Sequence, residues 1–233
     1  MQDIITLDYG SGGLKTAQLI DEILVPAFAN TALSQLGDGA VLPALDGPPV
    51  FSTDSFVVSP WRFPGGDIGK LAVCGTVNDL CMAGSVPHYL SFSLILEEGF
   101  ALDDLRAIVD SAARTARQAG VQIVTGDTKV VEHGRGDGIY INTAGVGVLR
   151  APGLGRGALR EGDVVLVSGS VGCHGAAVLM ARGDLPCEGA LLSDCRPLHQ
   201  LSAAALEAGG VRMLRDPTRG GVATTLNEFV EGS

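Results

Sequence analysis

Gly65-Gly-Asp-Ile-Gly-Lys-Leu-Ala-Val-Cys-Gly-Thr-Val-Asn-Asp-Leu80 is the stretch that decides the fold. Its two glycines predict a turn, Asp67 is a good helix N-cap, and apolar residues follow at helical spacing. A carboxylate on a buried helix face is too costly to leave unpaired, so Asp79 needs a basic partner, backbone donors or a metal ion. We expect that face to be buried because four of its five residues are apolar or small: Ile68, Ala72, Gly75, Asp79 and Met82.

Strands and helices alternate on both sides of this helix. Apolar runs predict strands at 50–58, 88–97, 121–131 and 138–149, and amphipathic spacing predicts helices at 15–28 and 102–119. Shorter strands are expected at 4–8 and from Gly37 to Leu42. After a Gly/Pro-rich linker at 151–157 we expect strands at 163–170 and 211–214, and helices at 174–182, at 197–208 and around Asn227.

The order of these elements predicts an α/β (α+β) protein. We expect an N-terminal domain over residues 1–150, with a mixed sheet and flanking helices, and the start of a second α/β domain at 151–233. The part after the linker has too few strands to cover its own helices. It therefore looks like an incomplete domain.

Composition and charge exclude several functional classes. The net charge of −10 argues against nucleic acid, whose binding depends on cations that neutralise phosphates. No apolar run approaches the length of a membrane span, and the N-terminus lacks the basic region of a signal peptide. We expect a cytoplasmic protein without a membrane partner. A nucleotide remains compatible with this charge if metal ions, glycine amides and a few placed cations hold its phosphates.

The five cysteines form no Cys-x-x-Cys pair, so neither a zinc site nor a disulfide framework is expected. Cys74 and Cys81 are two helical turns apart and are expected to pack as small apolar residues. Cys173 and His174 are adjacent, but neighbours along a chain seldom converge on one reacting atom. A catalytic dyad is not expected there.

Three aspartates share a local pattern that suits a metal ion. Asp54 lies between two hydroxyl residues, Asp127 precedes Thr128, and Asp79 follows Asn78, each inside an apolar element. Carboxylates with hydroxyl neighbours suit Mg²⁺, a hard cation that also binds substrate phosphates. Asp38 is a fourth candidate. The alternative is that each aspartate caps a turn or pairs with a buried arginine.

Glycines and lysines near these acids are compatible with phosphate binding. Gly10-Ser-Gly-Gly13 precedes a predicted helix, where backbone amides can converge on a phosphate, although a plain strand–helix turn would look the same. The chain has only three lysines, and all three fall in the same segments as these motifs: Lys15, Lys70 and Lys129. A lysine ammonium is a point charge suited to phosphate.

Several long motifs resemble the HypE family of hydrogenase maturation proteins, which belongs to the aminoimidazole ribonucleotide synthase (PurM-like) superfamily. The resemblance runs from near the N-terminus to the last residue. It is carried by Gly10–Gly13, Ser52-Thr-Asp-Ser55, Phe63-Pro-Gly-Gly-Asp-Ile-Gly-Lys-Leu-Ala-Val-Cys-Gly-Thr-Val-Asn-Asp79, Ile95–Gly99, Ile123-Val-Thr-Gly-Asp-Thr-Lys-Val-Val131, Ile141–Gly145 and Arg215-Asp-Pro-Thr-Arg-Gly-Gly221.

This resemblance implies a PurM-like fold, a homodimer that joins strands into a shared barrel, and ATP–Mg²⁺ sites near the dimer interface. It implies ATP-dependent dehydration of a carbamoylated cysteine (a thiocarboxamide) to a thiocyanate. The expected partners are the carbamoyltransferase HypF, which loads the carbamoyl group, and a HypC–HypD complex, which receives cyanide for the iron of [NiFe]-hydrogenase.

The resemblance also implies roles for individual residues. Lys129 would neutralise the transferred phosphoryl group or take part in deprotonating the amide, acting with Asp79 and Asp127. The implied metal ligands are Asp38, Asp54, Asp79 and Asp127. The implied nucleotide-binding residues are Gly10, Ser11, Gly12, Gly13, Lys15, Asp38, Asp54, Lys70, Asn78, Thr128, Asp216, Thr218 and Arg219, of which the last three would close the cleft.

The chain departs from the family pattern at its C-terminus. The family ends in a cysteine that accepts the carbamoyl group, whereas this sequence ends in Glu231-Gly-Ser233, and Cys173 stands where the family usually has an aspartate. We therefore expect a fragment that cannot complete the reaction alone. Two alternatives remain at this point, a kinase of the thiamine-monophosphate type and a non-catalytic nucleotide-binding scaffold for maturation partners.

Overall fold

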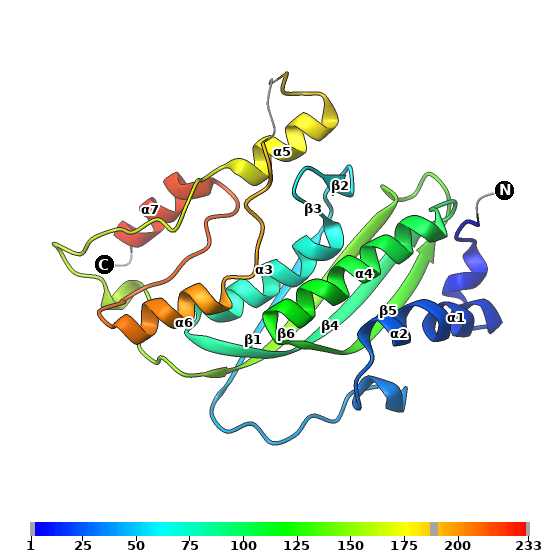
Figure 1. Ribbon diagram of the computed structural model, residues 1–233, viewed down its shortest axis with the longest axis horizontal. Coiled ribbons are helices and arrows are strands. Elements are labelled where there is room, and N and C mark those ends of the chain that lie inside the picture. Colours follow the sequence, from blue (N-terminus) through cyan, green and yellow to red (C-terminus); the bar gives the residue numbers. More distant parts are fainter. Residues whose placement is uncertain (1–2, 187–190, 232–233) are drawn as a thin grey trace.

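The computed structural model describes residues 3–186 and 191–231 of the chain. Its centre is a four-stranded sheet in the order β1, β6, β4, β5, with α3 and α4 lying across one face (Figure 1). The strands are β1 (Pro49–Phe56), β4 (Ser85–Glu97), β5 (Gln122–Val131) and β6 (Ile139–Leu149). β6 runs antiparallel to both of its neighbours and β4 runs parallel to β5, so the sheet is mixed, as predicted.

Helix α3 (Ile68–Met82) is the predicted helix of the 65–84 stretch. The carboxylate of Asp67 caps it by accepting a 2.9 Å hydrogen bond from the backbone N–H of Lys70, which satisfies one of the free N–H groups of the first turn. A short hairpin of β2 (Arg62–Phe63) and β3 (Gly66–Asp67) leads into it. Burial extends beyond the predicted face, because the sheet, α4 and α6 surround the helix and also cover Val73, Cys74 and Val77.

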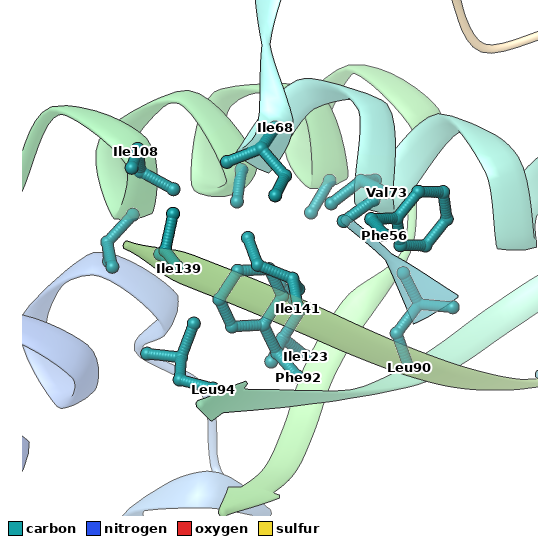
Figure 2. Packing of buried hydrophobic residues seen from close by; sticks show 14 of the residues in the cluster. Phe56, Ile68, Val73, Leu90, Phe92, Leu94, Ile108, Ile123, Ile139 and Ile141 are labelled. Carbon is teal, nitrogen blue, oxygen red and sulfur yellow. The ribbon is translucent and has the colours of Figure 1, made fainter. Parts of the chain in front are cut away.

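Helix α4 (Leu102–Ala119) begins and ends where predicted, with Gly120 in the left-handed conformation (φ 70°) after its last turn. It connects β4 to β5, and a crossover of this kind is what allows two consecutive strands to run parallel. Its apolar face meets α3 and the sheet in the main core, where side chains from the two helices lie over those of the strands (Figure 2). Full burial of each such aliphatic side chain contributes about 1.5–3 kcal/mol.

Two features bring α3 close to the sheet. The buried hydroxyl of Thr143 on β6 donates to the carbonyl of Ala72 at 3.0 Å and lies 2.6 Å from the hydroxyl of Thr76. Two strand residues further on, Gly145 lies so close to α3 that a Cβ there would sit 2.7 Å from Cγ2 of Thr76. A larger residue would force the helix off the sheet.

The N-terminal segment packs against β5 and α4. The predicted helix at 15–28 is present as α1 (Leu14–Leu19), one π-helical turn η2 (Ile20–Leu24) and α2 (Val25–Phe28). Pro26 has no N–H to offer the carbonyl four residues before it, and the wider π turn lies at that point. The strand predicted at 4–8 is wrong, because Ile4 forms only an isolated bridge and a 3-10 turn, η1 (Leu7–Gly10), follows.

After β6 the described chain is helical or irregular: η4 (Arg156–Ala158), α5 (Cys173–Arg182), α6 (His199–Ala208) and α7 (Gly221–Glu231). The predicted helices in this part are confirmed. The strands predicted at 37–42, 163–170 and 211–214 are wrong. A strand needs a neighbour for its backbone groups, and two of these segments lie open instead, with exposed fractions of 79% for Val41 and 89% for Leu166. Residues 33–35 form a 3-10 turn, η3 (Leu33–Gln35), ahead of the first of them.

None of the helices in the described part of the chain is both long enough and apolar enough to cross a membrane.

Candidate functional site

Two of the predicted aspartates meet where α3 crosses β1. Alternation along the strand places Ser52, Asp54 and Phe56 on the face that α3 covers. Gly75 allows the close approach, since a Cβ at that position would lie 2.7 Å from the Phe56 ring and 3.5 Å from the Asp54 carboxylate. One helical turn later Asp79 accepts a 2.9 Å hydrogen bond from the Ser52 hydroxyl. The stretch that decides the fold thus also positions the acids.

A third carboxylate, Asp216, joins these two from the segment that precedes α7. Burial raises the pKa of Asp216 to about 6, and the charge of Asp79 adds to the shift. Burial likewise raises the pKa of Asp79, against the opposing effect of the Ser52 hydroxyl. We call Asp54, Asp79 and Asp216 the acidic cluster. Carboxylates that repel one another in this way are a disfavoured arrangement unless a cation joins them.

The described side chains offer only partial compensation to this acidic cluster. Arg215 lowers the pKa of both Asp79 and Asp216. However, its guanidinium is also engaged by Glu228 of α7, at 2.9 Å, and Glu228 binds Arg156 at 3.2 Å as well. The positive charge beside the acids is therefore shared with Glu228.

A pocket of about 410 Å³ opens beside the acidic cluster. Ser52 and Asp79 form one wall. Arg156 and Arg215 supply cations on the side of the later segments, and apolar groups complete the lining, among them Met82, Leu154 and Met213. Apolar walls with a few convergent polar groups are typical of small-molecule sites.

Two further charged residues of the predicted set, Asp127 and Lys129, lie on β5. Lys129 and Asp127 form a 2.6 Å ion pair in which both side chains are more than half exposed. The ammonium of Lys129 keeps the pKa of Asp127 below its usual range. Thr128 lies between them and points to the opposite face of the strand.

The glycine-rich loop 10–13 lies beside this ion pair. A Cβ on Gly10 would sit only 2.6 Å from the backbone nitrogen of Val130, so the loop and the strand are in direct contact. Lys15, in the first turn of α1, donates to the Thr6 hydroxyl at 3.1 Å and lies 3.5 Å from the carboxylate of Asp8. Loop 10–13, Asp127 and Lys129 form a second group, here called the β5 group.

Within one chain the acidic cluster and the β5 group are apart. The register places Asp127 beside Ser93, and Ser93 beside Asn142. These three residues lie on the sheet face that α3 and α4 leave open, whereas Asp54 points to the covered face. β1 and β5 are also separated by three strand spacings of about 4.8 Å, or roughly 14 Å. The structure therefore unites two of the four predicted metal ligands, Asp54 and Asp79.

The remaining predicted site residues lie elsewhere. Asp38 is exposed in the irregular segment before β1. The ammonium of Lys70 donates to the carbonyl of Gly65 at 2.9 Å, and the Asn78 side chain binds the backbone ahead of α6. Thr218 and Arg219 are exposed ahead of α7, in the segment that carries Asp216.

Two residues of the site were missing from the predicted set. Ser52 orients Asp79, and Arg215 contributes the cation beside Asp79 and Asp216. Both belong to motifs that carry the family resemblance, Ser52-Thr-Asp-Ser55 and Arg215-Asp-Pro-Thr-Arg-Gly-Gly221. The signal for Ser52 was its position two residues before Asp54, which puts both side chains on one face of the strand.

The donor set fits Mg²⁺ without forming a complete cage. No three His, Cys, Asp or Glu side chains converge tightly enough to hold a metal ion anywhere in residues 3–186 or 191–231. Mg²⁺ does not require such convergence, because it retains waters and is commonly bound by one or two carboxylates together with substrate phosphates.

Comparison with known proteins gives two family matches. Residues 36–149 match the N-terminal domain of AIR synthase related proteins, and residues 160–233 match the C-terminal domain. The chain is also 55% identical to the carbamoyl dehydratase HypE of Cupriavidus necator over 97% of its own length and 65% of that protein. It thus spans about two thirds of the length of this relative.

Two solved structures of HypE proteins are similar to this chain over most of its length. The hydrogenase maturation protein HypE in complex with ATP superimposes with a TM-score of 0.92 at 49% identity, covering 96% of this chain and 67% of that one. A structure of a HypE–HypF complex gives a TM-score of 0.77 at 48% identity, covering 92% of this chain and 70% of that one.

Proposed function

The chain belongs to the HypE family of carbamoyl dehydratases, and from this premise we propose that it provides the ATP-binding part of an enzyme that dehydrates a carbamoylated cysteine. The observation that carries the proposal is the acidic cluster beside a pocket that also presents two arginines. This arrangement suits a magnesium-bound triphosphate. The chain covers 65% of the length of its Cupriavidus necator relative, and the complete reaction is proposed for the whole protein.

The proposed reaction balances as follows. A thiocarboxamide, R–S–C(=O)–NH₂, and ATP give a thiocyanate, R–S–C≡N, with ADP, inorganic phosphate and a proton. The amide oxygen takes the γ-phosphoryl group and leaves as phosphate, while the nitrogen loses both protons. In the proposed pathway HypF supplies the carbamoyl group, and a HypC–HypD complex receives the cyanide for hydrogenase iron. A HypE relative has been solved with HypF, which supports the first of these partners.

Asp54 and Asp79, with Asp216 opposite them, are the residues that would hold Mg²⁺ in the acidic cluster. When bound, the ion would neutralise charge that develops on the phosphoryl oxygens. Ser52 fixes the orientation of Asp79 through its 2.9 Å hydrogen bond, and this limits the geometries that the carboxylate can adopt. The arginines that line the pocket would meet the remaining phosphate charge.

The β5 group would act on the transferred phosphoryl group. We assign Lys129 to charge neutralisation rather than deprotonation, because it is already engaged as the cation of an ion pair with Asp127. An incoming phosphoryl oxygen would compete with the Asp127 carboxylate for the ammonium. The amides of residues 10–13 lie ahead of α1, where an anion is favoured, and Lys15 stands nearby in its first turn.

We further propose that two copies of the chain pair through the open side of the sheet. The face opposite α3 and α4 carries the β5 group, and it also exposes the apolar side chains of Phe51 and Ile95. β1 and β5 are the two edge strands of this sheet, and an edge strand can pair with a second chain. If β1 of one copy paired with β5 of the other, the β5 group of one copy would lie beside the strand that carries Asp54 of the other, which one chain alone does not do. In this proposal residues 1–150 form the ATP-binding and dimerisation domain, and residues 151–233 belong to a second domain.

The binding test is isothermal titration calorimetry with MgATP on the 233-residue chain. Asp79→Asn and Asp127→Asn are expected to abolish binding, while Asp137→Asn in the exposed 132–138 loop serves as the matched control. Circular dichroism must show that each variant keeps its helices. Normal MgATP affinity in both site variants would refute the proposed site.

The activity test uses the longer protein with HypF, carbamoyl phosphate and ATP. Loss of water from the carbamoylated C-terminal peptide, seen by mass spectrometry together with ATP consumption, is the expected result. Nucleotide binding without turnover would instead indicate a scaffold for the maturation partners. Phosphorylation of added thiamine monophosphate would indicate the kinase activity of the wider superfamily.

A further inference from the structure

Two cysteines that are far apart in the sequence meet between α3 and the segment that leads into α6. Cys74 lies in the second turn of α3 with 1% of its surface exposed. Cys195 belongs to residues 191–198, which run along that helix, and it is partly exposed. The two thiols lie close enough for each to shift the pKa of the other. Neither thiol belongs to the acidic cluster or the β5 group.

The backbone around Cys195 is fixed against α3 on both sides. Asn78 lies one helical turn after Cys74, and its amide accepts from the N–H of Leu198 at 2.8 Å and donates to the carbonyl of Arg196 at 3.2 Å. On the other side, the N–H of Ser193 donates to the carbonyl of Pro64 at 2.8 Å. The thiol contact is therefore held by hydrogen bonds on either side of it.

We propose that Cys74 and Cys195 form a redox pair that closes reversibly to a disulfide. A disulfide requires that the backbone bring two thiols together, and the hydrogen bonds of Asn78 and Ser193 hold the 191–198 segment against α3 at this point. In a reducing compartment the pair would remain as thiols, and transient cytosolic disulfides of this kind are typically redox-sensing.

The closing step needs a disulfide as oxidant, and glutathione disulfide is the chemical class that we name. The partly exposed Cys195 attacks first as its thiolate, forming a mixed disulfide and releasing one glutathione thiolate. Cys74 then attacks the Cys195 sulfur and releases the second. Two electrons pass to glutathione, and the two thiol protons end on the released glutathione molecules.

The local electrostatics agree with this order of attack. The hydrogen bond from Cys74 lowers the pKa of Cys195, and the ammonium of Lys70 acts in the same direction. The same hydrogen bond, together with burial, raises the pKa of Cys74. Cys195 is thus the better nucleophile, and as a whole residue it is the more exposed of the two.

A disulfide here would tie the segment ahead of α6 to the helix that carries Asp79. Asn78 already connects the same two elements through hydrogen bonds, so the covalent bond would strengthen an existing contact without creating a new one. This inference does not depend on the proposed dehydratase activity, and its test needs no nucleotide.

The experiment equilibrates the folded chain with glutathione buffers, blocks the free thiols in acid, and analyses tryptic peptides by mass spectrometry. The expected cross-link joins Leu71–Arg106 to Gly183–Arg212, since trypsin does not cut between Arg196 and proline. Each peptide holds a second cysteine, Cys81 or Cys187, so fragmentation spectra must locate the bond. The measured quantity is the equilibrium constant for forming the Cys74–Cys195 disulfide from glutathione disulfide. We expect it to be at least about tenfold larger for the folded chain than for the chain unfolded in urea, because the fold holds the thiols together.

Matched variants separate this pair from the other thiols. Cys187→Ser is expected to leave the cross-link unchanged, whereas Cys195→Ser and Cys74→Ala are expected to abolish it. Should Cys74→Ala fail to fold, Cys195→Ser decides alone, because the partly exposed position tolerates the oxygen. The proposal is overturned if the wild-type chain forms no cross-link between these peptides in any buffer while folded, or if the cross-link persists in Cys195→Ser.

Discussion

Replacing Asp216 by asparagine should stabilise the chain at neutral and alkaline pH, although the substitution lies inside the candidate site. Asparagine keeps the size of the side chain and removes only the ability to ionise. Burial and the Asp79 carboxylate raise the pKa of Asp216 to about 6 from an ordinary value of 3.8. The folded state therefore disfavours the charged form, and the variant removes that cost.

The size and sign of the effect follow from this pKa. Each pKa unit corresponds to about 1.4 kcal/mol, so a rise of roughly two units corresponds to about 3 kcal/mol. Between pH 3.8 and about 6 the folded chain binds more protons at this position than the unfolded chain does. The free energy of unfolding therefore falls as pH rises through this window, and the full cost is present above it. We expect Asp216→Asn to be more stable by about 2–3 kcal/mol at pH 8 and nearly unchanged at pH 3.5.

Urea unfolding followed by circular dichroism measures this difference, with EDTA present and ionic strength held constant. Asp137→Asn, in the exposed 132–138 loop, is the control and should change stability by less than about 0.5 kcal/mol at either pH. Adding Mg²⁺ at pH 8 should stabilise the wild-type chain more than Asp216→Asn, because the ion would offset the same repulsion.

Two results would refute this reasoning. An equal stability change at both pH values would mean that the substitution acts through packing and not through ionisation. A loss of stability at pH 8 would mean that the charged form of Asp216 is favoured in the folded chain, for example through Arg215. Either result would remove the electrostatic argument for a cation at the acidic cluster.

Three further predictions concern the core and the β5 group. Gly145→Ala should lower the free energy of unfolding by about 1–3 kcal/mol, because its Cβ would lie within 3 Å of three side chains of α3 and β4. The control is Gly157→Ala, where the added methyl group meets open space and should change the stability little in the same urea experiment. Ile108→Ala, at a fully buried position of α4, should cost about 2–5 kcal/mol in thermal or urea unfolding, and a cost below 1 kcal/mol would contradict the described core. Lys129→Met should raise the pKa of Asp127 in a carboxyl NMR titration, because the ammonium that holds it down is gone, and an unchanged titration would show that the ion pair does not form in solution.

The sequence predicted the first part of the fold well for a physical reason. Helices α3 and α4 and strands β1, β4, β5 and β6 all lie where the periodicity of apolar residues placed them. Their patterns are long, and each is reinforced by a cap or turn such as Asp67 or Gly120. Local preference and tertiary packing agree in these elements.

The later segments were predicted less well because a segment forms a strand only if a neighbouring strand is available to pair with it. Val164 and Leu166 belong to an apolar run that reads as a strand, yet in this structure they remain exposed and unpaired by any described strand. β-propensity reports how well a residue fits a half-buried pleated surface, and no such surface is formed there. The same reason applies to 37–42.

For the candidate site, the sequence predicted which residues carry the chemistry better than it predicted which of them lie together. It singled out Asp54, Asp79 and Asp127 as one constellation, but spacing along a chain does not tell which face of a sheet a strand residue will occupy relative to a distant strand. The mixed strand order places Asp127 on the opposite face. The Cys74–Cys195 contact was equally invisible, because it depends on where the 191–198 segment crosses α3.

The strand order has a consequence for how the chain is made. β6 is synthesised last of the four strands of this sheet, yet it lies between β1 and β4, and its register pairs Pro49 with Val148. While the chain emerges from the ribosome, β1 has no partner until Ile139–Leu149 has also emerged, whereas β4, α4 and β5 are consecutive and can assemble earlier. The β1 side of the sheet, which supplies Asp54, must then form late. A nascent chain halted before residue 139 would hold Asp79 on its helix without the strand that positions it.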